Sequence, residues 1–366
     1  MIIPADKRAA FSAAIALIAS HLPTRHAVPA YAMIRIIGHG DALTLEGHGE
    51  SSALTLRLPI SAPADLNLAV RGKVLAQVLH ALPAGDLHFD VNGSKLALRS
   101  GRSKFALPLP ALDAIPALSQ PSDASAIRVL SGELLTKFRA VSSACATGSV
   151  DRPVLSGVYL QISPDGQITT AGTDGRRLSR TGPACLAAAD HAAKGIALPP
   201  ATLKILTQLL PQSEELTISY SATRVLFVAP TWSLCSQLLE GSYPNVDMII
   251  PASFRHSIPL TDAETVSVRE ALRLAALAAE LSQAPSILVE IQDGQLQISA
   301  DSEDGSCSEI VPVAGAVAGP SVRVNHEYFL EALRQDLPTT LSLNDSVSPL
   351  KLTQGEAIHI IMPMRN

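Results

Sequence analysis

The sequence predicts an α+β fold made of three tandem repeats of one domain. Helix-like stretches with apolar residues at three- and four-residue spacing occur six times. Alternating strand-like segments joined at Gly-containing turns follow each of them, and the whole order recurs three times along the 366 residues. At about 100–200 residues per domain, this length suits two to four domains. We therefore expect three similar domains at residues 1–120, 121–254 and 255–366.

Each repeat is expected to open with a helix and a hairpin. The first helices are predicted at Asp6–Leu22, Gly132–Ala146 and Val268–Leu281. The hairpins begin at Ile34, Val158 and Ile287. A glycine lies in or beside each hairpin turn, where a positive φ costs little. The three repeats therefore share one order of elements.

A second helix and a closing pair of strands complete each repeat. The second helices are predicted at Arg71–Leu82, Pro199–Leu210 and Val324–Leu337. The closing strands begin at Leu87, Leu216 and Leu341. Two proline-rich segments, Pro108–Ala126 and Gly241–Leu260, separate the repeats and are predicted to be linkers.

Composition favours a soluble protein without cofactors. Hydrophobic residues make up 47% of the chain, which is enough for cores, and aromatic residues only 4%. The longest apolar passage, Ala9–Leu22, is shorter than the roughly 20 residues of a membrane span, and no signal-peptide pattern opens the chain. Cys145, Cys185, Cys235 and Cys307 lack metal-site spacing. We expect a cytoplasmic protein with no membrane contact, metal, cofactor or disulfide framework.

Charge is distributed unevenly along the chain. The net charge is −5, yet the six predicted helices together are net positive, so the remainder is more negative than the whole. An acidic protein is a poor ligand for a polyanion unless its cations gather on one face. Three similar domains in a row also suggest an arc or a closed ring, because repeated neighbour contacts generate closed or spiral assemblies.

Four segments carry a resemblance to a known family: RPVLSGVYLQI at Arg152–Ile162, AGTDGRRLSR at Ala171–Arg180, EGSYPNVDMIIP at Glu240–Pro251 and IIMPMRN at Ile360–Asn366. In this order, on a threefold repeat, they resemble the bacterial beta sliding clamp, the beta subunit of the replicative DNA polymerase holoenzyme. The resemblance implies three DNA-clamp domains per chain and a head-to-tail homodimer. That dimer would close into a six-domain, helix-lined ring around duplex DNA.

The resemblance also implies a function without catalysis. Such a ring is a processivity factor, which holds DNA by topology and tethers a polymerase near the template. The implied partners are double-stranded DNA bound without sequence preference, the polymerase catalytic subunit, the ATP-driven clamp loader and other proteins with a clamp-binding motif. Phosphate contacts carry no sequence information, so the DNA contacts are expected to depend on salt.

By position, the resemblance assigns three sets of residues. A pocket for short peptides is expected at Leu155, Thr173, Gly175, Arg176, Leu178, Pro244, Ile249, Asn325, Tyr328, Val347, Ile361, Met362, Pro363, Met364 and Arg365. DNA contacts are expected at Arg25, Arg71, Lys73, Lys137, Arg139, Arg152 and Lys204. The dimer interface is expected to join Phe105 and Leu107 of one subunit to Ala276 and Leu277 of the other.

The chain departs from the family pattern at several of these positions. Arg176 stands where the family often has His, and Met248 stands where Arg is common, so we expect a shifted peptide preference. Pro200 and Ala201 replace residues that are commonly basic, which predicts a weaker grip on DNA at that helix.

Two alternatives stay open from the sequence. An enzyme would combine Asp174 with a histidine, or Asp301 with Glu303, as acid and base. No nucleophile elbow, phosphate loop or HExxH motif supports that hypothesis, and Asp174 also fits a turn-forming role. A specialised or accessory clamp paralogue, from a mobile element or linked to resistance, is the second alternative.

Overall fold

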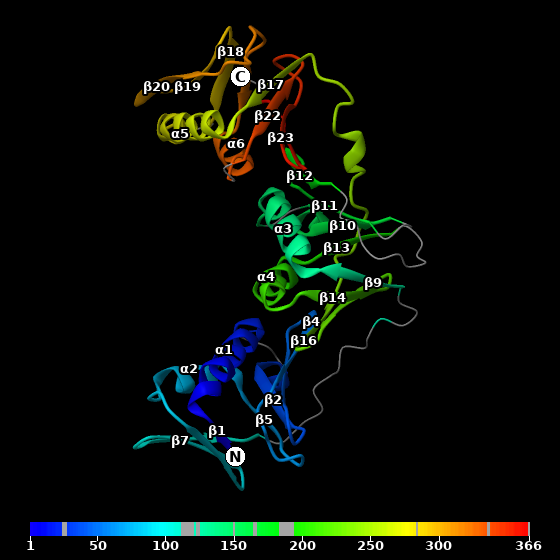
Figure 1. The fold of residues 1–366 in the computed structure, drawn as a ribbon, viewed down its shortest axis with the longest axis vertical. Coiled ribbons are helices and arrows are strands. Elements are labelled where there is room, and N and C mark those ends of the chain that lie inside the picture. Colours follow the sequence, from blue (N-terminus) through cyan, green and yellow to red (C-terminus); the bar gives the residue numbers. More distant parts are fainter. Residues whose placement is uncertain are drawn as a thin grey trace. The chain divides into compact units, whose positions relative to one another are not determined.

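The computed structural model describes residues 1–23, 28–110, 121, 125–148, 151–163, 167–182, 194–282, 285–334 and 337–364. Within them the predicted α+β class and the threefold repeat are confirmed, because the order strand, helix, four strands, helix, three strands occurs three times (Figure 1). The sequence pattern predicts only one hairpin between the two helices of each repeat, whereas the structure has four strands there.

The elements have the following bounds. The first repeat contains β1 (Ile2–Ile3), α1 (Ala5–His21), β2 (Met33–Gly38), β3 (Leu43–His48), β4 (Ser52–Leu58), β5 (Asn67–Arg71), α2 (Gly72–Ala81), β6 (Leu87–Asn92), β7 (Lys95–Ser100) and β8 (Ser103–Pro108). The second contains β9 (Ser125–Leu130), α3 (Ser131–Val141), β10 (Val158–Ile162), β11 (Ile168–Thr173), β12 (Arg177–Thr181), β13 (Lys194–Leu198), α4 (Pro200–Leu209), β14 (Glu215–Tyr220), β15 (Arg224–Ala229) and β16 (Trp232–Gln237). The third contains β17 (His256–Leu260), α5 (Asp262–Ala279), β18 (Ile287–Gln292), β19 (Gln295–Ser302), β20 (Gly305–Pro312), β21 (Val322–Val324), α6 (His326–Ala332), β22 (Thr339–Leu343), β23 (Leu350–Gln354) and β24 (Ala357–Ile361).

The chain divides into two compact units, each with one eight-stranded and one four-stranded antiparallel sheet. The first unit has the strand orders β5-β2-β3-β4-β16-β15-β14-β9 and β1-β6-β7-β8. The second has β13-β10-β11-β12-β24-β23-β22-β17 and β20-β19-β18-β21. Each large sheet joins strands of two repeats, at β4–β16 and at β12–β24. The domain boundaries expected from the sequence stay a prediction.

In the first unit, α1 and α2 lie side by side (Figure 1). Phe11, Ile15 and Ile18 of α1 are fully buried, and Phe11 meets Phe89 of β6 edge to face with ring centroids 6.4 Å apart. A Cβ at Gly47 of β3 would lie 2.2 Å from the Ile18 side chain. Glycine at this position therefore lets α1 approach the sheet closely.

In the second unit, the two helices of the third repeat differ in length from the prediction. Helix α5 begins six residues earlier than expected because Thr261 and Glu264 form a capping box. The Glu264 main-chain N–H donates to Thr261 Oγ1 at 3.2 Å, and the Thr261 N–H donates to Glu264 Oε2 at 2.8 Å. The first turns of α5 were not predicted because their polar residues do not contribute to the apolar spacing by which the helix was recognised. Helix α6 is shorter, since Val324 belongs to β21 and Asn325 caps the helix.

Three further expectations concern absences. Across the described residues, no helix combines the length and apolar character needed to span a membrane. The described cysteines, Cys145, Cys235 and Cys307, are free thiols, and Cys185 lies outside the described residues. The described part of the chain contains no group of three His, Cys, Asp or Glu side chains suited to a metal ion.

A buried histidine lies where β12, β24 and β23 meet. His359 is 7% exposed, and its Nδ1 lies 2.8 Å from Ser179 Oγ on the neighbouring strand. Burial lowers the pKa of His359 to about 4, well below its ordinary value of 6.5. Because the unfolded chain binds a proton between these two pH values and the folded chain does not, stability falls as the pH falls from 6.5 toward 4.

We expect the free energy of unfolding to decrease by up to about 3 kcal/mol between pH 7 and pH 4 on account of His359 alone. His359→Asn retains a polar partner for Ser179 but does not titrate in this range. Urea unfolding at several pH values checks this. The variant should lose less stability on acidification than the parent, and equal pH slopes would contradict the assignment.

Candidate functional site

The site begins at the turn between β11 and β12. Thr173 Oγ1 accepts from the Gly175 N–H at 3.1 Å and donates to the Arg177 carbonyl. Asp174 Oδ1 accepts from the main-chain N–H groups of Arg176 and Arg177 at 2.8 and 3.0 Å. Gly175 has φ +88°, a conformation that favours glycine. The Thr-Asp-Gly sequence therefore produces a well-defined turn. Asp174 has the turn-forming role that the sequence also suggested for it.

Arg177 fixes this turn to the third repeat. Its guanidinium pairs with Asp174 at 3.0 Å and with Glu331 of α6, and it stacks on the Tyr328 ring 4.1 Å from the centroid. The Arg177 side chain is only 14% exposed. Glu331 also binds Arg334 at 2.9 Å. Two ion pairs and one cation–π contact thus hold one guanidinium, which orients the turn relative to α6.

The linker after β16 forms a second wall. Tyr243 stacks on Tyr159 of β10 with parallel rings 4.4 Å apart, and Val246 is buried beside Leu178 and Ile360. The short helix η5 (Val246–Met248) follows, with the Asn245 side chain as its N-cap. These contacts anchor a proline-rich segment that sequence patterns describe only as a linker.

Helix η5 presents one large apolar side chain to solvent. Asp247 of η5 pairs with Arg180 of β12 at 3.1 Å, which ties the helix to the sheet. Met248 is 83% exposed, the highest value among the exposed large hydrophobic side chains of the described residues. Its neighbour Ile249 is 36% exposed. This segment therefore holds an apolar rim at a fixed place.

The turn, the linker and the last strand enclose a first hollow of about 220 Å³. We call it the Leu178 hollow. Its lining is mostly apolar, with two arginines at its edge, and comprises Arg152, Leu155, Thr173, Gly175, Arg177, Leu178, Pro244, Ile249, Ile360 and Met362.

A second hollow of about 610 Å³ lies along the C-terminal segment, and we call it the Met364 hollow. It is lined by Leu288, Ser321, Arg323, Ser346, Val347, Met362, Pro363 and Met364. Main-chain hydrogen bonds hold this segment in place: the Met362 N–H donates to the Arg176 carbonyl at 2.9 Å, and the Met364 N–H to the Arg323 carbonyl at 2.8 Å. Met362 lines both hollows, so the two are adjacent.

The charges at these hollows are all positive. Arg152 and Arg177 line the first and Arg323 lines the second, while neither lining includes an aspartate or glutamate. Arg177 is already paired with Asp174 and Glu331, so Arg152 and Arg323 are the cations to consider for a ligand. Apolar floors with these arginines beside them suit a ligand with apolar anchors and acidic or carbonyl groups. The arrangement is suited to binding such a ligand.

The structure brings together ten of the fifteen predicted pocket residues in these two hollows. Four others lie nearby in different roles: Arg176 is exposed, Asn325 caps α6, Tyr328 lies beneath Arg177, and Ile361 is buried in the core. Arg365 lies outside the described residues.

Several lining residues were missed from the sequence. For the last strand the signal was available, because side chains alternate and Ile360 shares a face with Met362 whereas Ile361 does not. Arg152 was assigned to DNA, yet it lines the Leu178 hollow and donates to the Ser242 carbonyl at 3.1 Å. The other missed residues are Arg177, Leu288, Ser321, Arg323 and Ser346.

The predicted DNA contacts have mixed surroundings. Arg71, Arg139 and Lys204 are exposed on or beside α2, α3 and α4, and Lys73 on α2 is partly exposed. Lys137 requires a correction: it is 6% exposed, and its ammonium donates to the Gly182 carbonyl and lies 3.3 Å from Glu356. An ammonium held in this way is not presented to a phosphate. Arg25 lies outside the described residues.

The four predicted interface residues divide into two classes. Phe105, on the edge strand β8, is 46% exposed, and Leu277 of α5 is 62% exposed. Leu107 and Ala276 are 4% and 5% exposed, so they support the folded chain and have little free surface to offer a partner.

Models of one known protein family match most of this chain. Two family models match, the DNA polymerase III beta subunit N-terminal domain over residues 6–119 and its central domain over residues 130–245, together well over half of the chain. The chain belongs to the DNA polymerase III beta subunit family. The resemblance inferred from sequence motifs is thereby confirmed.

Relatives of similar length support the assignment. The beta sliding clamp of Streptococcus pneumoniae is 25% identical over 94% of both chains, and that of Synechococcus elongatus is 23% identical over 96% of both. Among solved structures, the beta subunit from DNA polymerase of Streptococcus pyogenes has a TM-score of 0.89 at 21% identity, covering 100% of this chain and 99% of its own. A sliding clamp from Pseudomonas aeruginosa bound to griselimycin has a TM-score of 0.90, also at 21% identity, with the same coverage. These likenesses confirm the clamp fold.

We expect Arg177→Met to lower the free energy of unfolding by about 2–4 kcal/mol, because Asp174 and Glu331 lose a mostly buried partner. Arg177→Lys keeps the charge but not the forked geometry, so its loss should be smaller. Denaturant unfolding of the parent and both variants measures this. If Arg177→Met were as stable as the parent, the contacts of Arg177 with α6 would contribute nothing to the free energy of unfolding.

Proposed function

We propose that this protein is a sliding clamp, a processivity factor that encircles duplex DNA as a head-to-tail dimer and tethers polymerases and other replication proteins. The observation that carries the proposal is family membership together with full-length matches to beta sliding clamps. The function is non-catalytic, because the relatives of similar length are beta sliding clamps. The comparisons do not favour an accessory paralogue.

A ring explains how an acidic protein stays on DNA. Topology holds the duplex, so the protein needs only weak, salt-dependent phosphate contacts and no base contacts. We assign these contacts to the exposed or partly exposed cations Arg71, Lys73, Arg139 and Lys204, with Arg25 as a further candidate. The ring is expected to move freely along DNA, because no contact reads sequence.

The Leu178 and Met364 hollows are the proposed docking site for partner peptides. A short extended segment with two apolar side chains would seat one in each hollow, and its acidic flanks would meet Arg152 and Arg323. Met362 and Met364 adapt to differing side chains because the thioether chain is flexible. The exposed Met248 at the rim favours peptides with an additional apolar residue there.

Closure of the ring is proposed to use the edges of the two four-stranded sheets. Strand β8 is one such edge and carries Phe105, while Leu277 lies on α5, in the unit whose four-stranded sheet has β20 as one edge. Pairing of free edges between subunits removes an aggregation liability. Phe105 and Leu277 supply the exposed apolar surface for that contact.

Retention on circular DNA tests the proposal. After loading by a clamp loader, the protein should remain on closed circular duplex DNA through gel filtration and should be lost when the circle is linearised, because only a topological link is released at free ends. Equal retention on both forms would contradict encirclement.

A matched variant sharpens the result. Leu277→Asp places a charge in the proposed subunit contact and should shift the protein toward monomers in sedimentation and abolish retention on circles. Ala263→Asp, at an exposed position near the other end of α5, serves as the control for an added charge on this helix.

Peptide binding is the other expected outcome. Met364→Ala combined with removal of Arg365 and Asn366 should weaken binding of a fluorescent peptide with two apolar anchors and acidic flanks by at least tenfold, because the Met364 hollow loses its wall. Fluorescence polarisation measures this, and Val317→Ala, exposed but outside both hollows, is the control. Unchanged affinity in the truncated variant would refute the assignment.

A further inference from the structure

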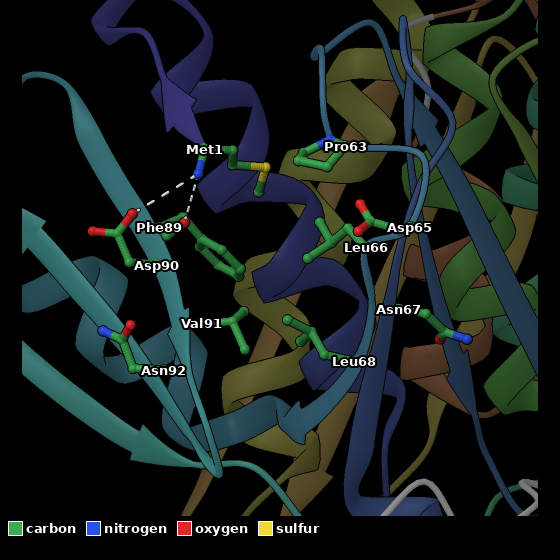
Figure 2. A pocket seen from close by; sticks show the side chains of 10 residues that line it. All are labelled: Met1, Pro63, Asp65, Leu66, Asn67, Leu68, Phe89, Asp90, Val91 and Asn92. Carbon is green, nitrogen blue, oxygen red and sulfur yellow. Dashed lines mark hydrogen bonds and ion pairs between the residues drawn. The ribbon is translucent and has the colours of Figure 1, made fainter.

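A third hollow, of about 560 Å³, lies within the first unit (Figure 2), and we call it the edge slot. The loop before β5 and the start of β5 form one wall, and the second half of β6 forms the other. The lining residues are Met1, Pro63, Asp65, Leu66, Asn67, Leu68, Phe89, Asp90, Val91 and Asn92. None of them belongs to the peptide hollows, the predicted DNA contacts or the predicted dimer interface.

Strand β6 has an open edge in this slot. The short strand β1 pairs only with Leu87 and His88, and Met1 adds a reciprocal pair of main-chain hydrogen bonds to Phe89, both 2.8 Å. Main-chain groups of an antiparallel strand alternate between its two sides, so those of Val91 point the same way as those of Phe89. Among the described residues, Val91 has no main-chain partner on that side. Its N–H and C=O are therefore available to another strand.

The side chains around the slot alternate in the manner a bound strand requires. Phe89 and Val91 on one wall and Leu66 and Leu68 on the other point into the space between them in Figure 2, while Asp90 points away from it. Val91, the penultimate residue of β6, is paired with Leu96 of β7 and is still 46% exposed. An apolar floor beside an unpaired strand edge matches the way extended peptides add to sheets.

The rim of the slot favours a ligand with positively charged side chains. Asp65 and Asp90 line it together with Asn67 and Asn92, and no lysine or arginine does. Asp90 is already paired with Arg99 at 3.2 Å and lies 3.9 Å from the Met1 ammonium. Asp65 is exposed and has no ion-pair partner among the described residues, so it is the carboxylate that a bound cation would meet.

We propose that the edge slot binds an extended segment of a partner protein, in which small apolar residues alternate with lysine or arginine, as an added strand on β6. The main chain of the segment would take up the free N–H and C=O of Val91. Its apolar side chains would cover Val91, Leu66 and Leu68, and a cationic side chain would pair with Asp65.

The test uses the full-length protein and a fluorescein-labelled eight-residue peptide in which Val or Thr alternates with Lys or Arg. Val91→Pro removes the proposed donor without breaking the ladder to β7, since the Val91 N–H points away from that strand. Val91→Thr retains the donor and the shape and is the matched control. Asp65→Lys reverses the rim charge.

Fluorescence polarisation should show at least tenfold weaker binding for Val91→Pro and for Asp65→Lys, and a change of less than twofold for Val91→Thr. A peptide with Glu in place of Lys and Arg should bind at least tenfold more weakly to the parent. Hydrogen exchange should slow in residues 88–93 when the basic peptide is bound. Circular dichroism confirms that each variant is folded.

Three outcomes would overturn the proposal: equal affinity of the basic and acidic peptides, parent-like binding by Val91→Pro, or protection confined to residues 173–178 and 346–364, the segments of the other hollows. Protection of residues 88–93 that rises with protein concentration in the absence of peptide would identify a second copy of the chain as the occupant instead.

Discussion

The pairing of β12 with β24 is the contact on which the candidate site depends. It places Arg177–Thr181 beside Ala357–Ile361, segments about 180 positions apart in the chain, through five consecutive residue pairs. The turn before β12 and the tail after β24 consequently emerge at the same end of the sheet. Both hollows lie there, because Met362 continues from β24 and its N–H donates to the Arg176 carbonyl.

Side-chain contacts then fix the segments around the two hollows. Arg177 fixes the turn to α6, Tyr243 and Val246 anchor the linker on the sheet, and Asp247 secures η5 through Arg180. Aromatic stacking and ion pairs tie the surrounding segments together, while methionine, leucine, isoleucine, valine and proline side chains form most of the floor. Such a division favours one fixed shape of the site with adaptable contacts to its ligands.

Sequence patterns predict the helices and the repeat well because amphipathic spacing and turn glycines act locally. They also place Leu178, Met362 and Met364 at one site, although by family resemblance and not by local physics. What they cannot supply is which strands become neighbours. The roles of Arg177 and Arg323 depend on contacts across β12, α6 and the C-terminal tail, and the burial of Lys137 depends on Glu356, which lies 219 positions away. The start of α5 was also not predicted, although it depends on neighbouring residues. The capping box of Thr261 and Glu264 consists of polar side chains, which the apolar spacing does not detect.

The use of thioethers at the meeting point of two hollows has a chemical consequence. Met362 is 41% exposed and Met248 is 83% exposed, so both sulfur atoms are within reach of peroxide. Oxidation to the sulfoxide converts a flexible apolar side chain into a polar one. Oxidation of Met362 would place a polar oxygen atom in both hollows at once. A reductase that restores the sulfide would reverse the change. The flexible thioether that lines both hollows therefore also makes their polarity sensitive to oxidants.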